Sequence, residues 1–228
     1  MAKFFIQNEK LDNQIKEIRF RIYNTMNGVV SDSMREKGIV YEQNYGVDLP
    51  KIKGLAERYV PNHDLAMRLW ALQIRETMIL ATLLMPVEEF TAEEADKWIN
   101  DVSNIELAEQ ISMNLLAKTD FACEFSLKNA QSDDFWRKIT GFTLAARIWK
   151  KFNEEEQVEV IQATLKNADT EEFLLYKVVA VLLARLCRRG EKEAKEILEL
   201  VADFEHSGQK SKQYIFNEIR NEIYFLNF

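Results

Sequence analysis

The sequence is poor in the residues that bend or staple a chain. Its 228 residues include 7 Gly, 3 Pro and 2 Cys. Glycine and proline punctuate β-hairpins and flexible linkers, so their scarcity favours long helices joined by short connections. Cys123 and Cys187 are too few for a disulfide framework, and each lies in an apolar helical pattern. Both are therefore expected to be reduced core thiols.

Long apolar runs and an excess of cations are also missing. The longest apolar stretches, such as 178–183, fall far short of the roughly 20 residues that cross a bilayer. Residues 1–10 lack the uncharged apolar segment of a signal peptide, so we expect a cytoplasmic protein with no membrane span. Lys and Arg total 30 against 37 Asp and Glu, a net charge of −7. This balance argues against generic nucleic-acid binding but leaves room for a local basic face.

Several kinds of catalytic site have no support in the sequence. His63 and His206 are far apart, and no group of Cys, His and Asp has zinc-ligand spacing, so neither a metal nor a cofactor is expected. A Gly-rich phosphate loop, a dinucleotide fingerprint and a Gly-flanked serine nucleophile are all missing. Nucleotide hydrolysis and esterase chemistry are therefore unsupported.

What the sequence does contain is helical periodicity. Apolar residues recur at three- and four-residue spacing, as in Leu65, Leu69 and Leu72, which is typical of α-helices. The four tryptophans, at positions 70, 98, 136 and 149, follow this spacing and are expected to be core residues. The predicted helices are 10–26, 31–37, 48–59, 62–72, 74–85, 91–100, 103–117, 120–130, 133–151, 154–167, 170–189, 191–206 and 209–226.

Capping signals support these helices. Three pairs have the spacing of N-terminal capping boxes: Thr91 with Glu94, Ser103 with Glu106, and Asn153 with Glu156. Gly190 follows Arg188 and Arg189, where cations would face the negative end of a helix and glycine would take a left-handed exit.

The C-terminal half contains a weak internal repeat of 38 residues. Its matching pairs are Phe135 with Phe173, Ala146 with Ala184, Arg147 with Arg185, Lys150 with Arg188, and Lys151 with Arg189. The helices that follow match after a one-residue insertion, with Val158, Ile161 and Leu165 answering Ile197, Leu200 and Phe204. Self-similarity near 40 residues with two helices per unit points to a HEAT-type solenoid. We predict an all-α, HEAT-like helical-repeat fold that forms a single curved domain over residues 1–228.

Three segments of the N-terminal half occur in a familiar order. They are residues 31–34 (SDSM), 46–51 (GVDLPK) and 69–76 (LWALQIRE). Together they resemble the AlkD-type DNA alkylation-repair family, over roughly residues 15–205. The resemblance implies a HEAT-like solenoid whose concave face carries DNA, and some family members are glycosylases that excise positively charged alkylated purines.

The resemblance also implies where catalysis would lie. In the family, an aromatic residue and an Asp one turn apart act with a second aromatic residue and with basic residues that hold the DNA backbone. Here Glu109 takes the Asp position, whereas Ile105 and Val181 take the two aromatic positions and Ile139 takes that of an Arg. Aliphatic side chains offer no ring quadrupole to a cationic base, and the longer glutamate displaces the carboxylate. These departures argue against base excision of the family type.

Two further groups of charged residues are candidates from their spacing. Glu106 and Glu109 would share one helix face and could divide acid and base work; alternatively, Glu106 caps its helix and Glu109 is solvated. The nucleic-acid candidates are cations of the two repeats that would form a basic strip along phosphates: Arg147, Lys150, Lys151, Lys177, Arg185, Arg188 and Arg189. All but Lys177 also fall in last helical turns, where cations complement the helix dipole without any ligand.

Three functions remain open at this level. The leading hypothesis is a divergent DNA alkylation-repair-like protein that binds double-stranded DNA or another macromolecule on its concave face. The alternatives are an alkylpurine DNA glycosylase that uses Glu109 and a scaffold that binds a protein partner. For the first, we expect Arg147 and Arg185 on the same side of adjacent helices, Lys150 and Arg188 as a second pair, and Glu109 open to the same groove.

Overall fold

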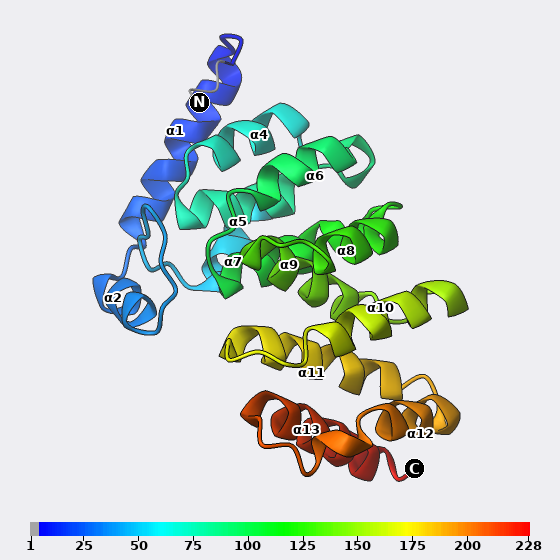
Figure 1. Ribbon diagram of the computed structural model, residues 1–228. Coiled ribbons are helices and arrows are strands. Elements are labelled where there is room, and N and C mark those ends of the chain that lie inside the picture. Colours follow the sequence, from blue (N-terminus) through cyan, green and yellow to red (C-terminus); the bar gives the residue numbers. More distant parts are fainter. Residues whose placement is uncertain (1–4) are drawn as a thin grey trace. The chain divides into compact units, whose positions relative to one another are not determined.

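The computed structural model describes residues 5–228, which fold into α-helices joined by short loops (Figure 1). Within this range no strand forms, and only Gln43 and Ile74 make an isolated bridge. No helix of this range is long and apolar enough to cross a membrane. The all-α prediction is therefore confirmed.

The chain divides into two compact units, one that ends at Thr119 and one that spans Asp120–Phe228. A single domain over 1–228 stays a prediction.

The first unit contains seven α-helices and two short 3-10 helices among its described residues. They are α1 (Glu9–Asn24), α2 (Gly28–Glu36), α3 (Leu49–Ala56), α4 (His63–Ala71), α5 (Arg75–Leu84), η1 (Val87–Glu89), α6 (Ala92–Ile99), α7 (Ile105–Asn114) and η2 (Leu116–Lys118). Helix α5 packs between α3 and α7 and also against α4. Nine of its ten residues are buried. It is therefore the central helix of this unit.

Asparagine starts four of these helices. The side-chain oxygens of Asn8, Asn27, Asn62 and Asn104 each accept a hydrogen bond from the backbone N–H three residues on, which satisfies one of the open donors of a helix start. Helix α2 therefore begins at Gly28, three residues before the predicted start. The capping prediction for Ser103 is wrong, because the adjacent Asn104 caps α7. The Thr91–Glu94 and Asn153–Glu156 capping boxes are both confirmed.

Stacked tryptophans join α4 to α6. Trp70 and Trp98 are both fully buried, with ring centroids 4.1 Å apart and planes 7° from parallel. The Trp70 Nε1–H donates a 2.7 Å hydrogen bond to Asp101. The core prediction is confirmed for these two residues, whereas Trp136 and Trp149 are only half-buried.

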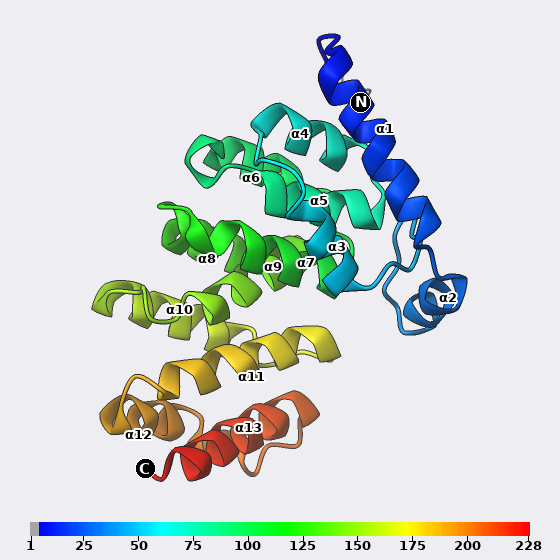
Figure 2. The ribbon, with the colours of Figure 1, turned by 180° about the vertical axis from the view of Figure 1, so that it is seen from behind.

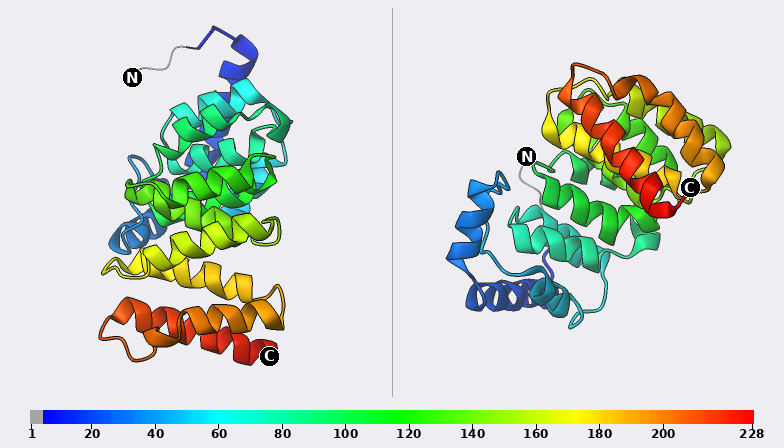
Figure 3. Two further views of the ribbon diagram at one scale, coloured as in Figure 1. Left: turned by 45° about the vertical axis from the view of Figure 1, so that its right-hand side comes forward. Right: turned by 90° about the horizontal axis from the view of Figure 1, so that it is seen from below.

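The second unit is built from two layers of helices. Its elements are α8 (Ala122–Ala130), α9 (Phe135–Arg147), α10 (Glu154–Lys166), α11 (Phe173–Cys187), α12 (Glu191–Leu200), η3 (Ala202–Phe204) and α13 (Lys210–Leu226). One layer holds α9, α11 and α13, and the other holds α8, α10 and α12. Figure 2 shows α11 beside α13, and Figure 3 shows α12 and α13 at the C-terminal end of the unit.

Cys187 is buried in α11, and burial raises the pKa of its thiol to about 12. Cys123 is only half-buried, so the core prediction is wrong for that thiol.

The internal repeat is correct in one layer and misaligned in the other. Helices α9 and α11 begin at Phe135 and Phe173, at the predicted spacing. In the other layer, Val158 is 55% exposed while its predicted partner Ile197 is buried; Val160 is the buried residue at the matching place in α10. Since α10 and α12 begin at Glu154 and Glu191, the second repeat is one residue shorter there, not longer.

Several helix ends differ from prediction. Helix α9 ends at Arg147, so Lys150 and Lys151 lie in the following loop and not in a last helical turn. Gly190 has an extended backbone, with φ 171°, and serves as the N-cap of α12. The left-handed exit predicted for it is therefore wrong. The predicted helices 103–117 and 191–206 each break into an α-helix followed by a 3-10 turn.

A glycine lets α8 and α9 approach closely. A Cβ added to Gly141 would lie 2.3 Å from the backbone nitrogen of Ala130. We expect Gly141→Ala to lower the free energy of unfolding by about 1–2 kcal/mol, because overpacking outweighs the gain in helix propensity. Gly54, in α3, has open space around its Cβ position, so Gly54→Ala should instead stabilise by up to about 1 kcal/mol. Urea denaturation of both variants tests the difference; equal shifts would contradict it.

Candidate functional site

Charge is segregated between the two helix layers of the second unit. Helix α9 contains three Lys or Arg residues and helix α11 contains two, and neither contains Asp or Glu. Helix α13 adds three cations against two glutamates. In the other layer, α10 has four glutamates against one lysine and α12 has four against two. We call α9, α11 and α13 the cationic layer.

Helix α11 turns one cationic row toward solvent. Phe173, Lys177, Val181 and Arg185 are all exposed and lie four residues apart, hence on one face of the helix. Opposite this row, seven residues of α11 are buried in the unit. The row is therefore an open surface on which cations alternate with apolar side chains.

The predicted basic strip divides into exposed and engaged residues. Arg147, Lys150 and Arg185 are exposed, and Lys150 lies over the ring of Trp149 at 5.1 Å. Arg188 instead pairs with Glu222 of α13, and this contact raises the pKa of its guanidinium.

Arg189 is engaged more deeply. Its Nη2–H donates a 2.8 Å hydrogen bond to the backbone carbonyl of Phe152, and its Nη1–H donates to Gln157. This arginine therefore links the end of α11 to the loop before α10. This structural role differs from the two roles considered from the sequence, which were contact with phosphates and compensation of the helix dipole.

Glu109 and its predicted companion Glu106 have different surroundings. Glu109 is exposed on α7, in the first unit. Glu106 is held by Arg75, whose Nε and Nη2 donate to its two carboxylate oxygens at 2.8 and 2.7 Å, and by the Tyr41 hydroxyl at 2.8 Å. Glu106 is therefore a partner of Arg75 and Tyr41, and the alternative that it caps its helix is wrong because Asn104 caps α7; the carboxylate pair stays a prediction.

The three aliphatic residues that the resemblance aligned with functional positions of the family are placed in two ways. Val181 is 41% exposed on the open row of α11, and Ile105 is half-buried at the start of α7. Ile139 is fully buried in α9, so this position points into the core and cannot present a cation to DNA. Its neighbours Arg137 and Lys138 are half-buried. They are the cations of α9 nearest to that position, and the sequence hypothesis had left them out.

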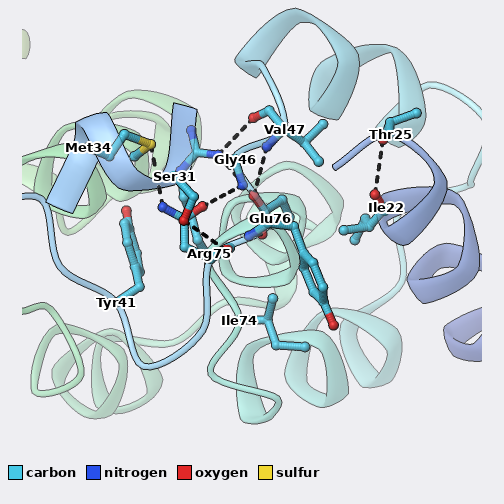
Figure 4. A network of polar contacts seen from close by, with 12 residues as sticks. Ile22, Thr25, Ser31, Met34, Tyr41, Gly46, Val47, Ile74, Arg75 and Glu76 are labelled. Carbon is cyan, nitrogen blue, oxygen red and sulfur yellow. Dashed lines mark hydrogen bonds and ion pairs between the residues drawn. The ribbon is translucent and has the colours of Figure 1, made fainter. Parts of the chain in front are cut away.

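A buried polar network holds the loop between α2 and α3 against α5 (Figure 4). The Glu76 carboxylate is fully buried and accepts backbone N–H bonds from Tyr45 and Val47, at 3.2 and 3.1 Å. Arg75 donates to Glu76 and, at 2.7 Å, to the carbonyl of Val47. Burial alone would lower the pKa of Arg75, but its contacts with Glu106 and Glu76 raise it on balance. Arg75 is therefore a permanent cation at the centre of this network, which we call the loop latch.

The loop latch contains the residues that carried the family resemblance. Ser31 donates its hydroxyl to the carbonyl of Asn44, and the N–H of Gly46 donates to the Asn44 side chain. Segments 31–34, 46–51 and 69–76 thus meet at one place, where they fix the fold of the loop. These residues therefore have a structural role in this chain.

Residue types with metal-ligand chemistry occur among the described side chains. Among residues 5–228, His, Cys, Asp and Glu side chains form no group of three that could hold a metal ion. His63 is instead bonded to Glu94 at 2.8 Å, within the cap of α6. This pair serves the packing of α4 and α6.

The fold and the sequence both have known counterparts. The family model described as DNA alkylation repair enzyme matches residues 27–213. No curated protein matches the sequence. A solved structure, described as a new family of proteins related to the HEAT-like repeat DNA glycosylases with affinity for branched DNA structures, superimposes with a TM-score of 0.76. It is 14% identical and the match covers 90% of this chain and 94% of that one. The prediction of a HEAT-like helical-repeat fold is confirmed.

Proposed function

Because this chain belongs to the DNA alkylation repair enzyme family, we propose that it binds the backbone of double-stranded DNA through the cationic layer of its second unit, without excising bases. The observation that carries the proposal is the separation of charge between the two helix layers. A protein of net charge −7 can bind a polyanion only where cations are gathered and acids are excluded. Helices α9 and α11 meet both conditions.

The exposed cations of this layer suit contacts with phosphates rather than with base edges. Arg147, Lys177 and Arg185 are exposed on helices without acidic residues. Lys177 and Arg185 are eight residues apart on one helix, which is about 12 Å along its axis. This separation spans three to four base pairs at about 3.4 Å per pair. Such contacts position DNA without reading its sequence.

Base excision lacks the groups it would need. The resemblance places Ile105 and Val181 at the two positions that carry aromatic rings in the family, and aliphatic side chains offer no ring quadrupole to a cationic base. Among the residues that the resemblance aligns with catalytic positions, Glu109 is the one that keeps the family's type of side chain, a carboxylate. The solved structure of similar fold is described by its affinity for branched DNA, so a four-way junction belongs beside a plain duplex among the probes.

The test of the proposal is charge reversal on the cationic layer. The variant Arg147→Glu/Arg185→Glu should bind duplex DNA about tenfold or more weakly, because two phosphate contacts become repulsions. The slope of log affinity against log salt should also fall by about 2 in magnitude, at about 0.9 per phosphate contact. Fluorescence anisotropy at several salt concentrations measures both quantities.

The matched control makes the same change of charge on the acidic layer. Lys192→Glu/Lys195→Glu alters two exposed cations of α12 and should leave affinity within about twofold. Equal losses in both variants would mean that only total charge matters, and absence of salt-sensitive binding in the wild type would refute the proposal. In a parallel assay on methylated DNA, wild type should release no more alkylpurine than Glu109→Gln. A release that depends on Glu109 would favour the glycosylase alternative.

A further inference from the structure

Three aromatic side chains meet where α11 and α13 begin. The ring of Phe173 lies 5.3 Å from that of Tyr176 and 6.3 Å from that of Tyr214, and the two tyrosine rings are 5.3 Å apart. The interplanar angles of 89° and 71° describe edge contacts of Phe173 with the two tyrosines, and the angle of 58° describes a tilted contact between the tyrosines. Because no two of these rings are stacked and Phe173 is exposed, part of the Phe173 ring is open to a further contact; we call the three residues the aromatic cluster.

One member of the aromatic cluster, Phe173, belongs to the exposed row of α11. Phe173 is 52% exposed. Lys177, one turn further along α11, places its ammonium 5.9 Å from the centre of the Phe173 ring. An exposed ring beside a cation is the pairing that single-stranded nucleic acids use, with the ring under a base and the cation near its phosphate.

A polar cavity opens next to the aromatic cluster. Its volume of about 490 Å³ falls within the usual range for small-ligand sites. Tyr176 forms its aromatic wall, Asp169 and Glu171 supply hydrogen-bond acceptors, and Gln209 and Lys210 supply donors. Asp169 is itself held by Gln209 and Lys212, and the contact with Gln209 lowers the pKa of its carboxyl. The cavity therefore offers mixed polar partners to the edge of a planar heterocycle.

We propose that the aromatic cluster holds one unpaired nucleobase, so that the protein prefers duplex DNA that carries a single-stranded extension over blunt duplex. This inference rests on the proposed DNA binding and names its substrate more narrowly. The cationic layer holds the duplex, and Phe173 of the aromatic cluster lies on the open row of α11, about 18 Å from Arg185 along the helix axis. A base that leaves the duplex at its end meets Phe173 with Lys177 near its phosphate.

Packing between α11 and α13 is the competing explanation for the aromatic cluster. Tyr176 and Tyr214 are half-buried and serve that packing in either case. Phe173 is more exposed than the two tyrosines. A substitution at Phe173 therefore distinguishes base binding from helix packing. Replacing it with leucine keeps an apolar side chain against the tyrosines but removes the stacking face.

The experiment compares three labelled probes by fluorescence anisotropy. They are a blunt duplex of about 20 base pairs, the same duplex with about four unpaired nucleotides, and that extended duplex with abasic sites in place of the unpaired bases. The abasic probe keeps the added phosphates and removes the bases. Wild type should bind the extended duplex about fivefold or more tightly than the other two, since stacking contributes at least about 1 kcal/mol per base.

The variants then assign the preference to the aromatic cluster. Phe173→Leu should abolish the preference and leave binding to blunt duplex within about twofold. Tyr224→Leu removes an aromatic residue that is 85% exposed at the far end of α13 and should keep the preference. Wild type that binds all three probes equally, or a preference that survives Phe173→Leu, would overturn the inference while leaving duplex binding in place. Absence of binding to every probe would instead refute the proposed function.

Discussion

Replacing Arg75 with methionine is expected to lower the free energy of unfolding by about 3–5 kcal/mol, the cost of removing one partner from a buried ion pair. Arg75 is 3% exposed and lies between the carboxylates of Glu76 and Glu106. Without the guanidinium, two carboxylates remain close together, one of them fully buried, and the carbonyl of Val47 loses a donor. Because methionine fills much of the volume of the arginine side chain, the loss of unfolding free energy measures the missing charge and hydrogen bonds, with little contribution from a cavity.

Urea denaturation followed by far-ultraviolet circular dichroism measures this loss through the midpoint and slope of the transition. Arg35→Met is the matched control, because Arg35 and Asp32 form an ion pair whose side chains are 70% and 69% exposed. Exposed pairs of this kind contribute little, so the midpoint should scarcely move. A loss below about 1 kcal/mol in Arg75→Met would show that the loop latch does not depend on this cation.

Gly46→Ala is expected to cost about 2–5 kcal/mol, the combined effect of backbone strain and overpacking. Gly46 has a left-handed backbone with φ 70°. An added Cβ would lie 2.1 Å from the carbonyl oxygen of Asn27 and 2.8 Å from the backbone nitrogen of Ser31. Both are main-chain atoms at the start of α2, so relief requires movement of the helix itself.

The control separates strain from crowding. Gly38 has φ 79° but nothing within 4 Å of its Cβ position, so Gly38→Ala carries only the backbone cost, roughly 1–2 kcal/mol. Thermal or urea unfolding of both variants gives the difference. Equal losses would mean that α2 shifts freely, and the close approach at Gly46 would then have no energetic weight.

Local sequence signals predicted most helices but not every boundary. Capping boxes at Thr91 and Asn153 could be recognised because their partners lie three residues away. At α7 two adjacent residues, Ser103 and Asn104, can both cap, and the choice depends on Asn104 donating its amide to the carbonyl of Val40, 64 residues earlier. Contacts of that separation cannot be read from a local pattern.

The candidate site shows the same limit. The cations at 147, 185, 188 and 189 were identified from their spacing, yet the partner of Arg188 is Glu222 on the last helix. Glu106 has the spacing of a capping residue, three positions after Ser103. Its actual partner, Arg75, lies 31 residues earlier in the sequence and could not be recognised from a local pattern. The separation of charge between layers could have been found by counting charges helix by helix, once the alternation of helices between two layers was assumed.

That separation of charge makes the second unit an electric dipole. A polyanion exerts a torque on a dipole before the two surfaces touch, and an approach with the acidic layer forward is repelled. The Debye length is about 8 Å at physiological ionic strength, so a nearby strand senses the facing layer more strongly than the total charge of the chain. In the proposed binding to DNA, this dipole would orient the acidic protein with its cationic layer toward the DNA before contact. Increasing the salt concentration would then lower the association rate constant as well as the affinity.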